Sequence, residues 1–299
     1  MASFTLRPSG AAAALLLAVL LWASNAVTIK LVLREIDPLA LTWLRYAIAC
    51  ALYAPYALVF GRAAAPYSRR ERWLLFWAGV TVVPIFNLTI YYALSYTTAA
   101  NASLVRLTEP AWVLLLAALV FGERASHRQL AGLGLALAGT LALVLLGRRA
   151  GGGEHHVLGM GFMVANSFSW IAYILCSKDL LRRHDAPLVT AHASLIGFGV
   201  LAVLTGVSHS QAVAAAAVRL SPLGWALVLY MAVAVTVGSN LLFNFGLKRL
   251  TAGAASAYAY LTPVCTALLA WLILGEPITA VLVACGLVIA LGVYLVNRA

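Results

Sequence analysis

The sequence predicts an all-α membrane protein with ten transmembrane helices, arranged as two inverted five-helix repeats, with the N- and C-termini in the cytoplasm. The first observation is composition: 64% of the 299 residues are hydrophobic and 10% are charged, whereas about 25% are charged in a soluble domain. The second is that apolar runs of about 20 residues, long enough to span a bilayer as helix, recur along the chain. The third is that the chain repeats itself at an offset of 153 residues.

The apolar runs predict the helices one by one. They are solidly apolar rather than alternating, which favours spanning helices over the strands of a barrel. The first run begins like a signal peptide, but it continues past Trp22 to Leu33, so we expect a helix that stays in the protein. In chain order the ten segments are 11–32, 38–60, 73–96, 100–121, 128–147, 158–177, 187–208, 222–246, 252–274 and 279–297.

The repeat relates the second half of the chain to the first. Tyr91–Glu123 and Asn244–Glu276 share 12 of 33 residues, including a proline and a final Gly-Glu pair. Near the start of each half, Lys30 matches Lys178 at an offset of 148. Five helices per half is an odd number, so the second half must be inverted relative to the first. The predicted organisation is a first repeat over 1–147, a hydrophilic linker over 148–157 and a second repeat over 158–299.

The net charge of +11 is a signal of topology. Thirteen of the twenty basic residues fall on the side of the N-terminus and five on the other side, which makes the N-terminal side cytoplasmic. These charges are spread over short loops, so we expect the lipid bilayer as a partner and no nucleic acid. The four cysteines all fall in apolar segments without metal-binding spacing, which predicts neither a metal site nor a disulfide framework.

Three sequence features resemble one known family. The first segment reads LWASNAVTIK, a P-x₁₁-G-E pattern spans Pro110–Glu123 and again Pro263–Glu276, and Arg45 stands inside the second segment. Together they resemble the EamA-type branch of the drug/metabolite transporter superfamily, and within it the amino-acid exporters of the YddG type. The resemblance implies a secondary transporter of the bacterial inner membrane, with a central cavity between its two halves.

Polar and aromatic residues inside the apolar segments are candidates for the substrate-binding site, because they are costly in a membrane. Several come in pairs related by the repeat. Two polar pairs are spaced four residues apart and so share a helix face, and two tryptophans are each followed three residues later by a polar side chain. The alternative is that these residues only pack helices together. The candidates are Trp22, Asn25, Asn87, Tyr91, Trp170, Tyr173, Asn240 and Asn244.

Charged residues inside the segments are the sharpest candidates. Arg106 and Glu109 are three residues apart and can pair on one helix. Arg45 lies at a similar predicted depth, so one positive charge is left over. We hypothesise that Arg106 or Arg45 attracts a substrate carboxylate, because arginine offers a bidentate fork, while Glu109 meets an ammonium group or carries a proton. The alternative is a structural ion network bracing the second and fourth segments.

Two repeat-related prolines, Pro110 and Pro263, are candidates for hinges, because a proline inside a helix produces a kink. The Gly-Glu pairs at Gly122 and Gly275 are expected to end helices. Glycines in the fifth and tenth segments are expected to allow close packing. His192 is the one histidine well inside a segment, and we interpret it as a packing residue.

These observations predict a secondary transporter that exports amino acids or related small metabolites across the bacterial inner membrane by alternating access. The sequence has no HExxH, GxSxG or Walker motif, so we expect no enzyme activity and no cofactor. A lipophilic-cation or multidrug exporter, using Glu109 as a free carboxylate, is the first alternative. A non-transporting structural membrane protein is the second. One chain contains a complete pathway, so a monomer suffices, and the oligomeric state is left open.

Overall fold

The computed structural model is helical throughout the part of the chain that it describes. That part comprises residues 8–61, 65–109, 127–147, 154–181, 183–239, 242–243 and 261–297. The elements in chain order are α1 (Pro8–Val32), α2 (Pro38–Gly61), α3 (Arg69–Val80), η1 (Thr81–Ile85), α4 (Phe86–Tyr96), α5 (Ala99–Arg106), α7 (His127–Gly147), α8 (His156–Leu180), α9 (Ala186–Arg219), α10 (Pro222–Tyr230), η3 (Met231–Gly238), α13 (Thr262–Leu269), η4 (Ala270–Leu274) and α14 (Ala280–Asn297).

Helix starts are set by short polar side chains that cap free backbone N–H groups. Asp37 accepts the N–H groups of Leu39 and Ala40 at the start of α2. Ser68 forms a complete capping box with Glu71 at the start of α3. At a helix end, Gly275 has φ 68° and terminates η4 in the left-handed conformation. This confirms the prediction that this glycine ends a helix.

Six helices among the described residues are long and apolar enough to cross a membrane, or seven if one bent pair counts as a single span. The first helix of that bent pair lies beyond the predicted end of the seventh segment at 208. Instead of stopping near 208, α9 continues to Arg219, with a non-helical Gly206 inside it. Its last part, Gln211–Arg219, then meets Pro222–Gly238 at 115°. Alanine-rich sequence beyond Gly206 keeps helical propensity although its mean apolarity falls.

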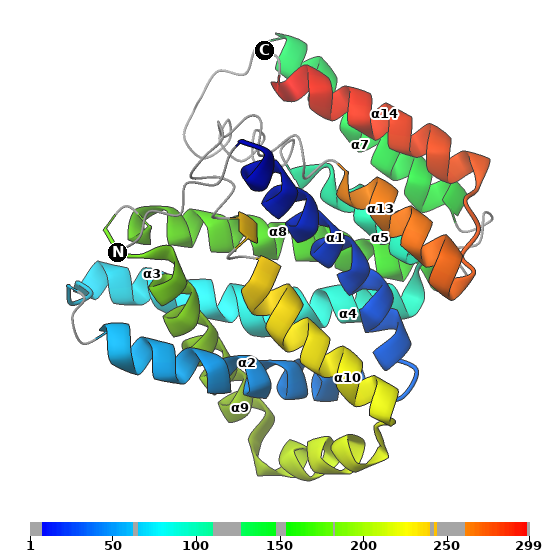
Figure 1. Ribbon diagram of the computed structural model, residues 1–299. Helices are drawn as coiled ribbons and strands as arrows, with labels where there is room; N and C mark the ends of the chain where they lie inside the picture. Colours follow the sequence, from blue (N-terminus) through cyan, green and yellow to red (C-terminus); the bar gives the residue numbers. More distant parts are fainter. Residues whose placement is uncertain are drawn as a thin grey trace.

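The helices pack in pairs that join early and late parts of the chain. Figure 1 shows α7 and α14 side by side at one edge of the bundle, and these two helices make extensive contact. In the same way α2 packs on α9, α4 on α8, α1 on α13 and α5 on α8. The first and second predicted repeats are therefore interleaved rather than stacked as separate bodies.

Glycines allow the closest of these helix contacts. A β-carbon added at Gly292 on α14 would lie 2.5 Å from the backbone nitrogen of Ala136 on α7. A β-carbon at Gly79 on α3 would lie 2.5 Å from the carbonyl oxygen of Ala193 on α9, and one at Gly197 would collide with the carbonyl of Gly79. At both places the backbones touch with no side chain between them. The contact at Gly292 is the close packing predicted for the fifth and tenth segments, whereas a β-carbon at Gly134 in the fifth would meet nothing.

Besides the non-helical Gly206, the irregularities of the described helices are three π-helical segments. Pro263 occupies the first turn of α13, where its missing N–H costs little, so it does not kink this helix. Pro110 lies outside the described residues. Pro84 instead sits inside the π segment η1, and η3 and η4 are two further π segments. A π turn holds one extra residue and often marks a functional position.

Candidate functional site

Arg45 is the centre of a polar cluster inside the bundle. Its side chain extends from α2 and is only 6% exposed. The Nε atom donates to Thr236 Oγ1 on η3 at 3.0 Å, and Nη1 donates to Tyr91 OH on α4 at 3.0 Å and to Asn25 Oδ1 on α1 at 3.3 Å. Four segments thus converge on one guanidinium, and all the acceptors that they supply are neutral.

Asn87 and Tyr91 extend this cluster along α4. The Tyr91 hydroxyl, which is fully buried, donates to Asn87 Oδ1 at 3.2 Å, so these residues share a face as predicted. Asn87 Nδ2 donates to Tyr46 OH at 3.1 Å and to the carbonyls of Val82 and Val83 at 2.8 and 3.0 Å. Those carbonyls belong to η1, whose wider turn leaves them accessible to a side chain.

A second π segment lies on the other side of the cluster. Thr236 of η3 accepts from Arg45 and donates to the carbonyl of Met231, five residues earlier, at 2.9 Å. Its backbone carbonyl accepts from Tyr53 OH at 3.3 Å. The eighth predicted segment therefore presents a π turn directly to Arg45, and the third presents one to Asn87. A pattern of apolar residues does not reveal such turns, although Pro84 was a signal for the first.

Arg106 and Glu109 form the predicted pair, with Nε and Oε1 3.3 Å apart. The guanidinium of Arg106 also lies over the ring of Phe86, 5.5 Å from its centre, a favourable cation–π distance. The ring centre of Phe86 lies 5.5 Å from that of Trp170, and Trp170 stacks on Tyr173 with ring centres 5.3 Å apart. The structure thus brings together four predicted site residues. Glu109 pairs with Arg106, and Phe86 connects Arg106 to Trp170 and Tyr173.

This aromatic row and the Arg45 cluster lie against different sides of α4. Phe86 and Asn87 are consecutive residues, and successive side chains on a helix point about 100° apart. Among the ion pairs of the described residues, Arg45 takes part in none, whereas Arg106 is paired with Glu109. Although the sequence placed these three residues at a similar depth, the partners of Arg45 are Asn25, Tyr91 and Thr236, because depth in the membrane does not fix the direction in which a side chain points.

Trp22 contacts the C-terminal part of the eighth predicted segment. Its Nε1 donates to Ser239 Oγ at 2.8 Å, and its ring lies 5.0 Å from that of Phe243. Trp170, its partner in the repeat, stacks with aromatic rings instead. Asn240 and Asn244, the two remaining candidates, lie outside the described residues.

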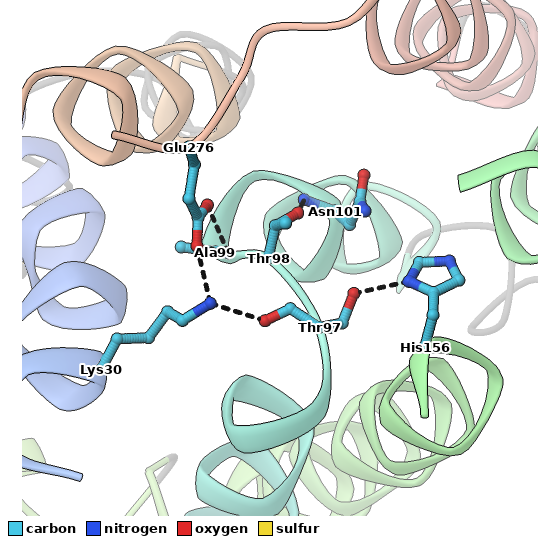
Figure 2. A network of polar contacts seen from close by, with 7 residues as sticks. All are labelled: Lys30, Thr97, Thr98, Ala99, Asn101, His156 and Glu276. Atoms are coloured by element: carbon cyan, nitrogen blue, oxygen red, sulfur yellow. Dashed lines mark hydrogen bonds and ion pairs between the residues drawn. The ribbon is translucent and has the colours of Figure 1, made fainter. Parts of the chain in front are cut away.

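A second polar network, shown in Figure 2, ties α1 to the end of η4 and the start of α5. Lys30 Nζ lies 2.6 Å from Glu276 Oε1 and donates to the carbonyl of Thr97 at 2.8 Å. Glu276 Oε2 accepts the N–H of Ala99 at 2.9 Å, so its carboxylate also sits at the positive end of α5. The Thr97 hydroxyl contacts His156 Nδ1 at 2.7 Å. We call these residues the Lys30 end.

A third network lies where α2 and α8 end and α3 and α9 begin, and we call it the Tyr67 end. The Tyr67 hydroxyl contacts His192 Nδ1 at 3.1 Å, and its ring lies 4.3 Å from that of His184. His184 Nε2 and Arg183 Nη1 lie 3.5 and 3.8 Å from Glu71 Oε1. Burial raises the pKa of the Tyr67 hydroxyl, and the nearby Glu71 carboxylate raises it further.

Both networks contain residues that the sequence did not propose for a site. Lys30 and Glu276 were visible as repeat markers on the same predicted side of the membrane, which was a usable signal. His184 and Tyr67 lie in loops and carried none. His192, interpreted as a packing residue, does pack against α2 beside Gly61 and also bonds to Tyr67.

Comparison with known proteins identifies the class. The model of the EamA-like transporter family matches residues 9–145 and again 157–298. The chain therefore belongs to this family: it is a transporter with several membrane helices, and it is not an enzyme.

Named relatives match nearly the whole chain. An uncharacterized transporter of Archaeoglobus fulgidus is 30% identical over 94% of this chain and 95% of its own. A "Probable amino-acid metabolite efflux pump" of Salmonella typhimurium is 27% identical, covering 94% and 92%. An "Aromatic amino acid exporter YddG" of Ancylobacter novellus is 25% identical, covering 91% and 92%. One crystal structure, 23% identical, covers 97% of both chains with a TM-score of 0.60, which is a likeness of fold.

Proposed function

We propose that this protein exports amino acids or related small metabolites across the bacterial inner membrane by alternating access between two inverted five-helix halves, 1–147 and 158–299. Both termini face the cytoplasm in this proposal. The names of the relatives support the class of substrate. The packing pairs support the internal two-fold, because exchanging the halves converts the contact of α1 with α13 into that of α5 with α8.

The observation that carries the proposal is the Lys30 end. It joins the first half, through Lys30 and Ala99, to the second half, through Glu276. On α1, Lys30 lies five residues beyond Asn25 of the Arg45 cluster, a rise of about 7.5 Å. A polar cluster deep in the bundle is thus covered at one end by a contact between the halves. Alternating access requires such a contact to break and re-form.

Export of lipophilic cations receives less support. That function needs a membrane carboxylate free to accept a proton or a cation. Glu109 is the one acid that the sequence places well inside a segment, and Arg106 neutralises it at 3.3 Å. Pairing of this kind removes the charge that would attract a cationic drug.

The test is efflux from liposomes containing the purified protein and loaded with the standard amino acids, followed by mass spectrometry. We expect a subset to leave faster than from protein-free liposomes. A parallel sample loaded with ethidium tests the alternative, with Glu109→Gln as its variant. Ethidium efflux that depends on Glu109, without amino-acid efflux, would contradict the proposal. Repeating both with and without a pH gradient measures coupling to protons.

A further inference from the structure

Arg45 carries a positive charge that no acidic residue in the described part of the chain compensates. The chain has nine Asp and Glu residues, and the eight within the described residues all lie elsewhere. The ninth, Glu123, lies outside the described residues. Glu276, Glu71, Glu109 and Asp179 are in ion pairs with other residues, Glu35 bonds to Ser221, and Asp37 caps α2. A buried unpaired cation is costly unless an anion accompanies it.

The direction of each hydrogen bond in the cluster is fixed by chemistry. Arginine can only donate, so Asn25 must present its oxygen to Arg45 and Tyr91 must accept through its hydroxyl. The Tyr91 proton is then free to reach Asn87 Oδ1. Asn87 Nδ2 in turn donates to two carbonyls and to Tyr46 OH.

This chain of bonds leaves donors without acceptors. Arg45 Nη2, Asn25 Nδ2 and the Tyr46 hydroxyl proton have no acceptor among the described residues. Each side-chain oxygen that contacts Arg45 already accepts a hydrogen bond from its Nε or Nη1. A surplus of donors around a buried cation is the complement of a group that has a negative charge and several lone pairs.

We propose that Arg45, with the free donors of Asn25 and Tyr46, binds the carboxylate of the transported molecule. This inference rests on the proposed function, because it assigns the site to that transporter's substrate. A carboxylate has two oxygens and one charge, which matches a guanidinium with one terminal nitrogen left over. The assignment favours Arg45 over Arg106, whose charge Glu109 already balances.

The site lies where the transport cycle needs it. Thr236 comes from the second half, whereas Asn25, Arg45 and Tyr91 come from the first. Movement of the halves therefore changes the set of partners around the guanidinium. A carboxylate bound there is covered by the Lys30 end, about one and a half helical turns further along α1.

The experiment compares molecules with and without the carboxylate, which needs no variant to fold. Wild-type liposomes are loaded with the standard amino acids or with their carboxamides, in separate mixtures. We expect the amino acids to leave roughly 10- to 100-fold faster, the effect of losing charge-assisted hydrogen bonds. R45Q should remove this preference by slowing the amino acids, and R45K should retain part of it, because it keeps the charge without the fork.

Matched controls separate a binding site from a structural brace. R70Q also removes an arginine, but one whose side chain is 80% exposed, and it should leave the preference unchanged. A brace would slow amino acids and carboxamides equally, so equal losses in R45Q overturn the inference while leaving the proposed function intact. Amino-acid efflux without discrimination by the wild type overturns it as well. No efflux of any amino acid by the wild type refutes the proposed function, and this inference with it.

Discussion

The Lys30 end and the Tyr67 end perform the same task with different chemistry. Each joins residues 1–147 to residues 158–299. At the Lys30 end the contacts are short, 2.6 Å from Lys30 to Glu276 and 2.9 Å from Ala99 to Glu276, and the pair is largely buried, with exposures of 23% and 10%. At the Tyr67 end, Glu71 is 3.5 Å from His184 and 3.8 Å from Arg183.

The difference indicates which end is held more firmly. The contact from Lys30 to Glu276 is short and largely buried, so water screens it only weakly. At the Tyr67 end the contacts to Glu71 are longer, and one of them comes from an arginine that is mostly exposed, so water screens it more strongly. We infer that this conformation is closed at the Lys30 end, and that the Tyr67 end opens at lower cost.

The largest effect is expected from locking each end in turn. In a background without Cys50, Cys176, Cys265 and Cys285, one variant replaces Lys30 and Glu276 with cysteine, and the other replaces Tyr67 and His184. Alternating access requires each end to open, so cross-linking either pair should reduce efflux to the protein-free level. The measurement is amino-acid efflux from liposomes before and after cross-linking.

Reversal with a reducing agent, using a reducible cross-linker, is the control for both locks. Single-cysteine variants treated in the same way should keep their activity. Full efflux with the Lys30 end locked would show that this contact does not move during transport. That result would remove the observation on which the proposed function rests.

Breaking the ion pair at the Lys30 end should have the next largest effect. Glu276→Ala leaves Lys30 partly buried without its partner and leaves the Ala99 N–H unpaired, which we expect to cost about 2 kcal/mol of stability. The measurement is the midpoint of thermal unfolding in detergent. Glu154→Ala, which removes an exposed acid, is the matched control, and an equal shift in both variants would contradict the prediction.

A smaller effect is expected from the helix cap at the Tyr67 end. Ser68→Ala removes the side-chain oxygen that accepts the Glu71 N–H at 3.2 Å, which should cost about 1 kcal/mol. Ser68→Thr keeps a capping hydroxyl and should lie close to the wild type. Thermal unfolding of the two variants distinguishes loss of the cap from a general effect of substitution.

The smallest effect is expected from the exposed ion pair at the same end. Arg70 and Asp179 are 2.9 Å apart, but their side chains are 80% and 46% exposed. Water and salt screen such a pair, so Arg70→Gln should change stability by less than about 0.5 kcal/mol. A shift as large as that of Glu276→Ala would mean that the two ends are held with similar strength.

The sequence predicted what depends on distance along the chain. Most helix positions followed from apolar runs, and the Asn87–Tyr91 and Arg106–Glu109 contacts followed from helical spacing, because both residues of each pair lie on one segment. Lateral neighbours were not predictable in this way. The guanidinium of Arg45 meets side chains from three other segments, and Lys30 meets a carboxylate 246 residues away, since hydropathy gives a residue's depth but not its direction.

The π turns were missed for a related reason. They insert one residue without changing the apolar pattern, so a run such as 73–96 gives no sign of them. Yet they decide the site: η1 supplies the carbonyls that orient Asn87, and η3 places Thr236 beside Arg45. The apolar pattern therefore located the third predicted segment, which the structure spans as Arg69–Tyr96, but not the π turn inside it that orients the candidate site.

Gly79 on α3 and Gly197 on α9 set the spacing of these two helices where they cross. Their backbones meet with no room for a β-carbon, so an early and a late helix of the chain touch here through backbone atoms alone. Interdigitated side chains would resist relative movement of two helices, whereas the backbone contact of α3 and α9 has no such side chains to resist it. A single methyl group at either glycine would collide with the backbone of the other helix, so this close approach of α3 and α9 requires glycine at both positions.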